Sequence, residues 1–481
     1  MRAPPKEILV RHIGQAQCCT RSVLGLVPKG AGSIMRPKIS STFYFLVLAV
    51  FFLAAGTKAY SEDLLDLYRQ AIDHDPLFKG ASYERLALKE GLKQARGRMM
   101  PDVSLEGVGS RTDQDIVHTT NPVFESGVAN YGSQLYTAKL VQPIFRYSLY
   151  IEAKQATNLS KRADVDLEIA KQDLIIRVAQ AYVSALAANE NMAAAEAERK
   201  DVEVFYGRAK TRYESGLAPD TDLRDAEARL AVVSAQVVKA DNDYRDALEA
   251  LSEITGSPVT ALNGLREELP LIPPDPDNPE DWVNVGLEHN LKIKSVQYDL
   301  DVAKEEVARQ EAAHYPTLDL MGRYYRNDMG GSLFGGGATV DTKDVTLTLT
   351  VPIFEGLIIS SKTREAKDRY EKGRQIFEQQ KRATIRQVNT FYNGVKSALS
   401  RAKALKVSVD AQTLLVAAKE QGYKSGMYAS LAVLDAARDL YLYRRDYAQS
   451  RYEYIINDLK LKQAVGTLSE SDVVAVNEWL R

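Results

Sequence analysis

Histidines are the first residues to test for catalytic or metal-binding chemistry, and in this chain they form no recognisable site. Beyond the first sixty residues there are four: His74, His118, His289 and His314. No two of them have the spacing that places a pair of imidazole ligands on one helix face. Acidic residues are abundant but scattered, as solvated charges usually are. The sequence therefore predicts neither an enzyme nor a protein that holds a metal or another cofactor.

Two other segments contain residue types that bind phosphate or calcium in other proteins. The run from Gly330 to Gly337 is rich in glycine, but no Gly-Lys-Ser/Thr follows and no helix opens there, so we interpret it as a hairpin loop. The segment from Pro270 to Asp281 contains several aspartates but lacks the glycine and terminal glutamate of a calcium loop. A linker is the favoured interpretation of this second segment.

Charge and cysteine content exclude further classes of protein. The formal net charge is −2, so no overall attraction to nucleic acid is predicted. Cys18 and Cys19 both lie in a segment that we expect to be removed. A mature chain without cysteine has no disulfide, no thiolate metal site and no cysteine nucleophile.

Residues 1–59 are predicted to be a signal peptide. Basic residues precede an apolar run over residues 43–55, and small residues stand at the positions that a signal peptidase reads before a cut after Ala59. The run is short for a membrane span, so cleavage is favoured over a retained anchor helix. Residues 1–34 form an unusual upstream extension, and Met35 is an alternative start.

The rest of the chain is built twice from one plan. Pro143-Ile144-Phe145 recurs as Pro352-Ile353-Phe354, and Gly256 recurs as Gly466. A duplicated sequence predicts two halves with one architecture. The predicted divisions are a first repeat over 60–257, an equatorial linker over 258–290, a second repeat over 291–466 and a C-terminal segment over 467–481.

Each repeat is predicted to contain a helix, a β-hairpin, a very long helix and a returning helix. Val345, Leu347 and Leu349 alternate with threonines, which indicates a strand with one apolar face. In the first repeat, a polar stretch from Ser110 to Ser133 is expected to separate the two strands. The segment from Ser148 to Tyr213 has no proline and is rich in helix formers, which predicts a rod of about 100 Å. Such rods need partner helices along their length.

Four strands cannot close a barrel in a membrane. Strands of about ten residues match the thickness of a bilayer, but lipid tolerates no open sheet edge. Transmembrane barrels have at least about eight strands. Several chains must therefore contribute, two giving a narrow barrel and three giving a twelve-stranded one with room for a channel.

From about residue 62 to 480 the chain resembles the TolC family of outer-membrane efflux and secretion channels, especially those of type I secretion. The resemblance is carried by five stretches: His314 to Leu320, Val351 to Gly356, Tyr423 to Ala436, Tyr454 to Asn457, and Ala464 to Leu468. It implies a mainly α fold with a small β part, assembled as a homotrimer. A twelve-stranded barrel in the outer membrane would continue into a periplasmic tunnel of coiled-coil helices, with residues 258–290 and 467–481 forming a belt around it.

The resemblance also implies a function. The protein would be the outer-membrane channel of a tripartite export system in a Gram-negative bacterium. It would passively conduct secreted protein or small toxic molecules from an inner-membrane ABC or proton-driven transporter and a periplasmic adaptor to the exterior. The alternative is a periplasmic coiled-coil scaffold without a pore, for which amphipathic β-hairpins would be unnecessary.

Aspartates beyond the helix reversals are the candidate entrance residues. In the resembling channels such aspartates ring the entrance and attract cations, and Asp435 occupies one of these positions, whereas Ala432 occupies the other. Asp222 and Asp225 occupy the equivalent region of the first repeat. The alternative is that these carboxylates only stabilise the start of a helix.

The two reversals are the candidate adaptor-contact sites. Gly216 and Gly426 supply the left-handed residue that ends a helix, which a simple cap already explains. Leu217 and Met427 add information, because an apolar side chain at a solvent-facing tip is costly without a partner. The resemblance implies that this partner is the periplasmic adaptor.

Overall fold

The computed structural model describes residues 62–118, 120, 127–266, 269–331 and 336–480. The chain divides into the units Met1–Lys58 and Ala59–Arg481, and all described residues belong to the second. The predicted signal peptide, its cleavage position and the centre of the glycine-rich loop lie outside the described residues.

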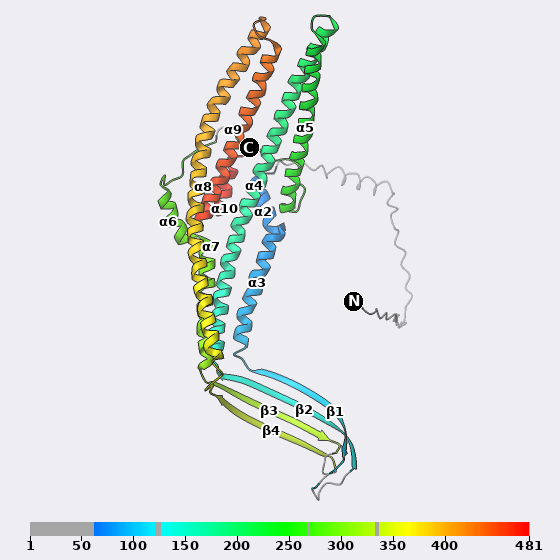
Figure 1. Ribbon diagram of the computed structural model, residues 1–481, viewed down its shortest axis with the longest axis vertical. Coiled ribbons are helices and arrows are strands. Elements are labelled where there is room, and N and C mark those ends of the chain that lie inside the picture. The colour runs from blue at the N-terminus through cyan, green and yellow to red at the C-terminus, as the bar shows by residue number, and fades with distance from the viewer. Residues whose placement is uncertain (1–61, 119, 121–126, 267–268, 332–335, 481) are drawn as a thin grey trace, which may run out of the picture. The chain divides into compact units, whose positions relative to one another are not determined.

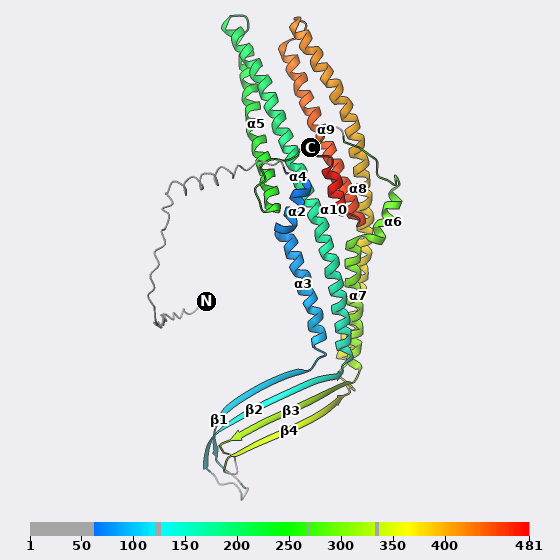
Figure 2. The same ribbon diagram turned by 180° about the vertical axis from the view of Figure 1, so that it is seen from behind.

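The described unit consists of long helices with one small sheet at their end (Figures 1 and 2). The first half contains α2 (Leu64–His74), α3 (Pro76–Gly97), β1 (Asp102–Ile116), β2 (Gly127–Phe145), α4 (Tyr147–Glu214) and α5 (Asp220–Thr255). The second half contains α6 (Pro279–His289), α7 (Leu291–Glu311), η1 (Ala312–His314), β3 (Thr317–Met329), β4 (Ala338–Thr350), α8 (Ile358–Lys424) and α9 (Ser430–Val465), and α10 (Glu470–Asn477) follows. Apart from the short η1, the order of helices and strands is the same in both halves, which confirms the predicted mainly α, duplicated fold.

The four strands form one antiparallel sheet in the order β1-β2-β3-β4. The prediction that residues 110–133 separate two strands is wrong, because β1 continues to Ile116 and β2 begins at Gly127. The polar residues pair across the ladder instead: Ser110 lies opposite Ser133, and their Oγ atoms are 2.7 Å apart. A ladder satisfies its backbone polar groups whatever the side chains are, so a polar composition does not end a strand. The strands are therefore 13 to 19 residues long rather than about ten.

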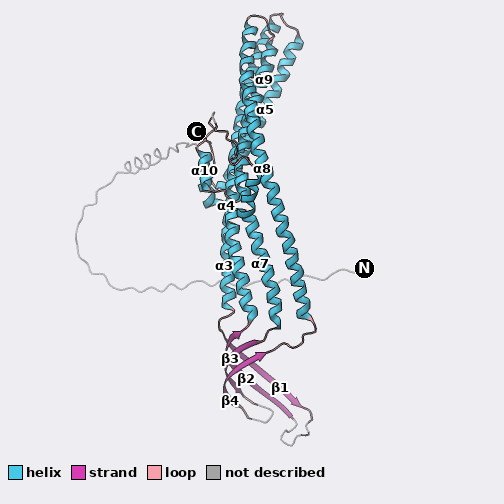
Figure 3. Cartoon of the chain, turned by 90° about the vertical axis from the view of Figure 1, so that its left-hand side faces the viewer, coloured by secondary structure: helices cyan, strands magenta, loops and turns pink. Residues whose placement is uncertain are grey.

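The long helices α4 and α8 contain 68 and 67 residues and run from the sheet to the far tips (Figures 1 and 3). Near the sheet, α4 and α8 pack with the shorter α3 and α7, and farther away they pack with α5 and α9. Each rod therefore has a partner along its length, as the sequence predicts. Within the described ranges, no helix is both long enough and apolar enough to cross a membrane.

The hydrophobic core lies midway along the rods, where α2, α5, α9 and α10 meet α4 and α8. Its fully buried residues include Leu174, Val178, Tyr182, Val388 and Leu459. A partly buried ion pair, in which Asp75 is buried and Arg177 is half-buried, fixes the break between α2 and α3. The Asp75 side chain accepts a hydrogen bond from the Phe78 amide at 2.7 Å and two from the Arg177 guanidinium at 3.0 and 2.6 Å. Proline at position 76 is tolerated because it is the first residue of the next helix.

The segments outside the repeats are held against the middle of the rods. Asp277 accepts hydrogen bonds from the Tyr392 hydroxyl at 2.6 Å and from Lys396 at 2.9 Å, and the Tyr454 hydroxyl donates to the Ile272 carbonyl at 2.9 Å. At the C-terminal end, Lys462 on α9 pairs with Asp472 on α10 at 3.0 Å. The predicted linker therefore packs against the helices. Its last part forms α6, which is the counterpart of α2 and so belongs to the second half of the duplicated fold.

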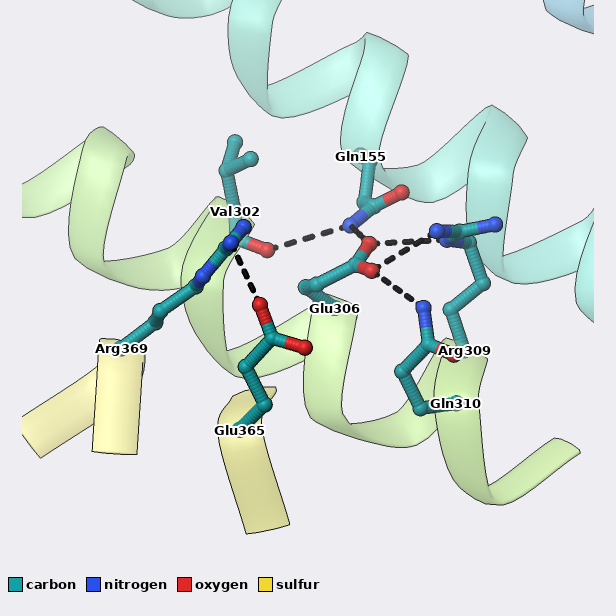
Figure 4. Close-up of polar contacts among 7 residues, drawn as sticks. All are labelled: Gln155, Val302, Glu306, Arg309, Gln310, Glu365 and Arg369. Carbon is teal, nitrogen blue, oxygen red and sulfur yellow. Dashed lines mark hydrogen bonds and ion pairs between the residues drawn. The ribbon is translucent and has the colours of Figure 1, made fainter. Parts of the chain in front are cut away.

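A polar network joins α4 to α7 near the sheet (Figure 4). Glu306 accepts hydrogen bonds from Arg309 at 2.8 and 2.7 Å and from Gln310 at 2.6 Å, all within α7. Gln155 on α4 donates to the same carboxylate at 3.0 Å. Hydrogen bonds from Arg309, then from Gln155 and Gln310, outweigh partial burial and lower the pKa of Glu306 to about 2.

Replacing Glu306 with glutamine is expected to remove a pH-dependent part of the stability. Because the folded pKa lies below the ordinary value, the carboxylate stabilises the fold fully above about pH 4.5, and this contribution is lost as pH falls toward 2. After allowance for solvent screening the contribution is about 1 to 2 kcal/mol. Melting temperatures in detergent should converge for wild type and variant between pH 5 and pH 2.5. The matched control is Glu365→Gln in the exposed Glu365–Arg369 pair on α8. Curves that stay parallel over this range would contradict the prediction.

Candidate channel entrance and helix-hairpin tips

The two helix reversals have the same backbone geometry. Gly216 and Gly426 have φ angles of 71° and 79°, in the left-handed region that glycine adopts without strain. After α4, the Gly216 amide donates to the Tyr213 carbonyl at 2.9 Å and the Leu217 amide to the Arg212 carbonyl at 2.8 Å. After α8, the Gly426 and Met427 amides make the corresponding bonds at 3.0 and 2.7 Å. This pair of bonds is the Schellman motif, which satisfies the last carbonyls of a helix.

Both helix reversals lie at the end of the rods farthest from the sheet (Figure 1). Each of them exposes an apolar side chain. Leu217 is 71% exposed and Met427 is 74% exposed. Neither side chain has a role in the cap, because the motif uses only the backbone amides of these residues. The chain therefore presents two equivalent, uncovered apolar tips.

The second tip has one feature that the sequence did not indicate. Gly422 lies in the last turn of α8, and the Tyr428 ring packs so closely on it that an added Cβ would overlap the ring. The first repeat has Arg212 at the corresponding position. The two tips thus have the same backbone conformation but differ in the side chains around it.

The structure brings two of the three candidate aspartates together through a residue that the sequence analysis missed. Arg229 on α5 lies 3.0 Å from Asp225 on the same helix and 3.6 Å from Asp435 on α9. Asp222, one turn earlier on α5, is exposed and has no ion pair within the described part of the chain. The pairing of Asp225 with an arginine four residues later on the same helix could have been predicted from the sequence. The contact of that arginine with Asp435 could not, because it depends on how the two halves pack.

Further contacts between the halves lie next to this arginine. The Tyr441 hydroxyl on α9 donates to Asp201 on α4 at 2.9 Å, and Arg438 lies 4.0 Å from Glu198. Burial first, and then the hydrogen bond to Asp201 and the charge of that group, raise the pKa of Tyr441 to about 12, so this hydroxyl is a donor at neutral pH. These residues line a groove between α4, α5 and α9 that Val202 and Val233 also line.

A last contact between the halves lies closer to the tips. The Arg208 guanidinium on α4 stacks over the Tyr423 ring on α8, with 5.5 Å between the guanidinium carbon and the ring centroid. Side chains of α4 and α5 therefore contact α8 and α9 at several levels below the tips. Among the described residues, histidines, cysteines and carboxylates form no cluster of three or more suited to a metal ion.

Comparison with known proteins identifies the class. The sequence profile of the family described as "Outer membrane efflux protein" matches residues 67–257 and 282–467. The chain belongs to this family. The first matched range lies within the predicted first repeat, and the second covers the predicted second repeat and begins within the predicted linker.

Individual relatives are similar over almost their whole length. The outer membrane protein TolC of Vibrio cholerae is 28% identical over 428 residues, which cover 89% of this chain and 95% of that protein. The alkaline protease secretion protein AprF of Pseudomonas aeruginosa is 26% identical, over 89% of this chain and 90% of the relative. The proteases secretion protein PrtF of Dickeya chrysanthemi is 25% identical, over 91% and 95%.

Solved structures show the same fold. The Campylobacter jejuni CmeC outer membrane channel superposes with a TM-score of 0.73 at 17% identity, covering 87% of this chain and 89% of that one. The outer membrane protein VceC of Vibrio cholerae gives a TM-score of 0.68 at 18% identity. The protein is thus an export channel of the outer membrane of a Gram-negative bacterium, as predicted, rather than a periplasmic scaffold. Its relatives are channel proteins.

Proposed function

We propose that three copies of the chain form one channel, with a twelve-stranded barrel in the membrane and a tunnel of helices in the periplasm. The open four-stranded sheet carries this proposal, because β1 and β4 have only one neighbouring strand each among the described residues. On one face of this sheet, Val345, Leu347 and Leu349 are 78%, 63% and 64% exposed. An exposed apolar face is what a lipid-facing surface requires. Twelve strands would remove all edges and leave a lumen.

Membrane fractionation followed by native mass measurement tests this assembly. The protein is expected in the outer-membrane fraction and, after detergent extraction, at three times the mass of the mature chain. A monomer in the soluble periplasm would contradict the proposal.

We propose further that the channel is a passive conduit, not an enzyme, and that it completes a tripartite system. Gly216, Leu217, Gly426 and Met427 would bind a periplasmic adaptor, which joins the channel to an inner-membrane ABC or proton-driven transporter. The cargo would be secreted protein, small toxic molecules, or both. Two relatives are named for protease secretion, which supports a polypeptide cargo. Deleting the gene and comparing secreted proteins with sensitivity to toxic compounds would separate the two kinds of cargo.

The entrance is proposed to lie at the tip end, with Asp435, Asp222 and Asp225 as its acidic residues. Arg229 neutralises part of this charge and links α5 to α9. Together with the Tyr441–Asp201 hydrogen bond, it would hold the two helix hairpins of each chain in the closed arrangement.

Replacing Asp435 with alanine is expected to weaken block of the channel by cations. The substitution removes three carboxylates from the entrance of a trimer and leaves Arg229 in place, so the local potential becomes more positive. Single-channel recordings in planar bilayers should show block by divalent cations reduced by about tenfold. The comparison variant is Asp222→Ala, at an exposed aspartate that has no ion pair in the described chain. It measures how much the first repeat contributes to block by cations. If conductance and block are unchanged in the Asp435 variant, that aspartate only stabilises the start of a helix and has no role at the entrance.

A further inference from the structure

The sheet face that bears Val345, Leu347 and Leu349, the outer face, carries no charge in its half nearest the helices. Among the described residues, the outer-face side chains of this half are uncharged on all four strands, and most of them are apolar. The opposite face is charged over the same stretch, with Glu106, Lys139, Arg323 and Asp344. The apolar surface is therefore a property of one face, which a bilayer covers in the proposed channel.

Farther from the helices the outer face becomes charged, and the charges follow a fixed order along the strands. The first charged residue is basic on three strands: Arg111 on β1, Arg326 on β3 and Lys343 on β4. The next outer-face residue on each of these strands is an aspartate, and these are Asp113, Asp328 and Asp341. A surface that only solvates its charges intersperses the two signs. The repeated order therefore indicates a layered surrounding.

The boundary between the uncharged and the charged part runs diagonally across the sheet. Lys343 on β4 is level with Tyr324 on β3, and Arg326 on β3 lies two residues farther from the helices. Gln134 on β2 and Arg111 on β1 each lie a further two residues out. The strands run obliquely to the rods, with β1 at the upper border of the sheet and β4 at the lower border (Figure 1). Because tilted strands are staggered, a boundary with this shift lies across the axis of the rods, as a membrane surface does.

The side chains at this boundary suit the surface of a bilayer. The Lys343 ammonium lies 5.9 Å from the centre of the Tyr324 ring, whose hydroxyl donates to Asp341 at 3.2 Å. Tyrosine is enriched where hydrocarbon meets the polar layer of a membrane. Arg326 pairs with Asp341 at 3.0 Å, whereas Arg111 and Lys343 are exposed and form no ion pair within the described part of the chain. Two of the three basic groups are therefore available to an anion outside the protein.

We propose that Arg111, Arg326 and Lys343 bind the phosphate groups of the glycolipid, lipopolysaccharide, in the outer leaflet of the outer membrane. The inference rests on the proposed barrel and names the lipid that surrounds it. Phosphates at the top of the acyl chains meet the first residues beyond an apolar surface. Basic side chains are attracted to such a layer, and carboxylates are repelled by it. The aspartates therefore lie one step farther out.

This assignment also explains the length of the strands. About ten residues cross a bilayer, but the strands contain 13 to 19. A charge on the lipid-facing side of a barrel is costly at mid-membrane and cheap near the surface. The part of the sheet beyond the basic residues therefore stands among the sugars and phosphates of the glycolipid, outside the hydrocarbon.

Lipid binding by the purified full-length channel tests the assignment. The channel in detergent is titrated with lipid A that carries two phosphates and with the same lipid after dephosphorylation, and bound lipid is counted by native mass spectrometry. Wild type is expected to prefer the phosphorylated lipid. The variant Arg111→Gln with Lys343→Gln leaves the Arg326–Asp341 pair intact and should bind the phosphorylated lipid about thirtyfold more weakly.

Two control variants separate phosphate recognition from a change in net charge. Lys139→Gln with Arg323→Gln removes the same charge from the opposite face of the sheet and should bind lipid like wild type. Arg111→Lys with Lys343→Arg exchanges the two basic residues and should keep the preference for phosphate.

The possible failures are distinguishable. Equal binding of the two lipids by a wild-type trimer, or an unchanged preference in the Arg111 and Lys343 variant, would overturn this assignment and leave the channel standing. Displacement of the lipid by inorganic phosphate, but not by chloride at the same ionic strength, would indicate a site for free phosphate and would also overturn it. A soluble periplasmic monomer would overturn the proposed barrel and this inference together.

Discussion

Replacing Leu217 and Met427 together with aspartate is expected to abolish export while the trimer still reaches the outer membrane. Both side chains are more than two-thirds exposed at the tips, and the caps that form these tips use only backbone amides. Folding should therefore tolerate the change. A charge placed in an apolar contact must be desolvated without a partner, and two such contacts should weaken adaptor binding at least about a hundredfold.

The measurement compares secreted cargo and recovery of the adaptor with the purified channel. The exchange Leu217→Met with Met427→Leu is the matched control, because it keeps both tips apolar, and it should preserve export. Normal export and normal adaptor recovery in the aspartate variant would show that the tips are ordinary helix caps.

Replacing Tyr441 with phenylalanine is expected to open the entrance. The hydroxyl donates to Asp201 across the two hairpins at 2.9 Å, and its pKa of about 12 keeps it protonated at neutral pH. A half-buried hydrogen bond to a charged group contributes about 1 kcal/mol, so three copies contribute about 3 kcal/mol. Loss of all three should raise the ratio of open to closed channels on the order of a hundredfold.

Single-channel recordings at neutral pH would show this as a higher open probability and a larger mean conductance. Tyr443→Phe is the matched control, since Tyr443 lies on the same helix, is exposed, and has no hydrogen bond from its hydroxyl in the described part of the chain. A Tyr441 variant that conducts like wild type would mean that this hydrogen bond does not hold the entrance closed.

Much of the fold was predictable because its signals are local. The sequence predicts a returning helix in each repeat, and these helices run over Asp220–Thr255 and Ser430–Val465. They stop where Gly256 and Gly466 adopt the left-handed conformation that ends a helix. The duplication also predicted two equivalent reversals, and the backbone hydrogen bonds of the first reversal correspond to those of the second. The length of the strands was not predictable from composition, because pairing between Ser110 and Ser133 depends on the ladder rather than on apolar alternation.

The sequence by itself determined the repeat, the rods, the reversals and the family. Each of these depends on residues close together in the chain or on the spacing between the two copies. Only the tertiary structure decided which residues face one another across the halves. Arg229 meets Asp435, and Tyr441 meets Asp201, because α5 and α4 pack beside α9 at one particular rotation and height. Such pairs lie some two hundred residues apart, and a helix rotated by one residue, about 100°, would bring other side chains together.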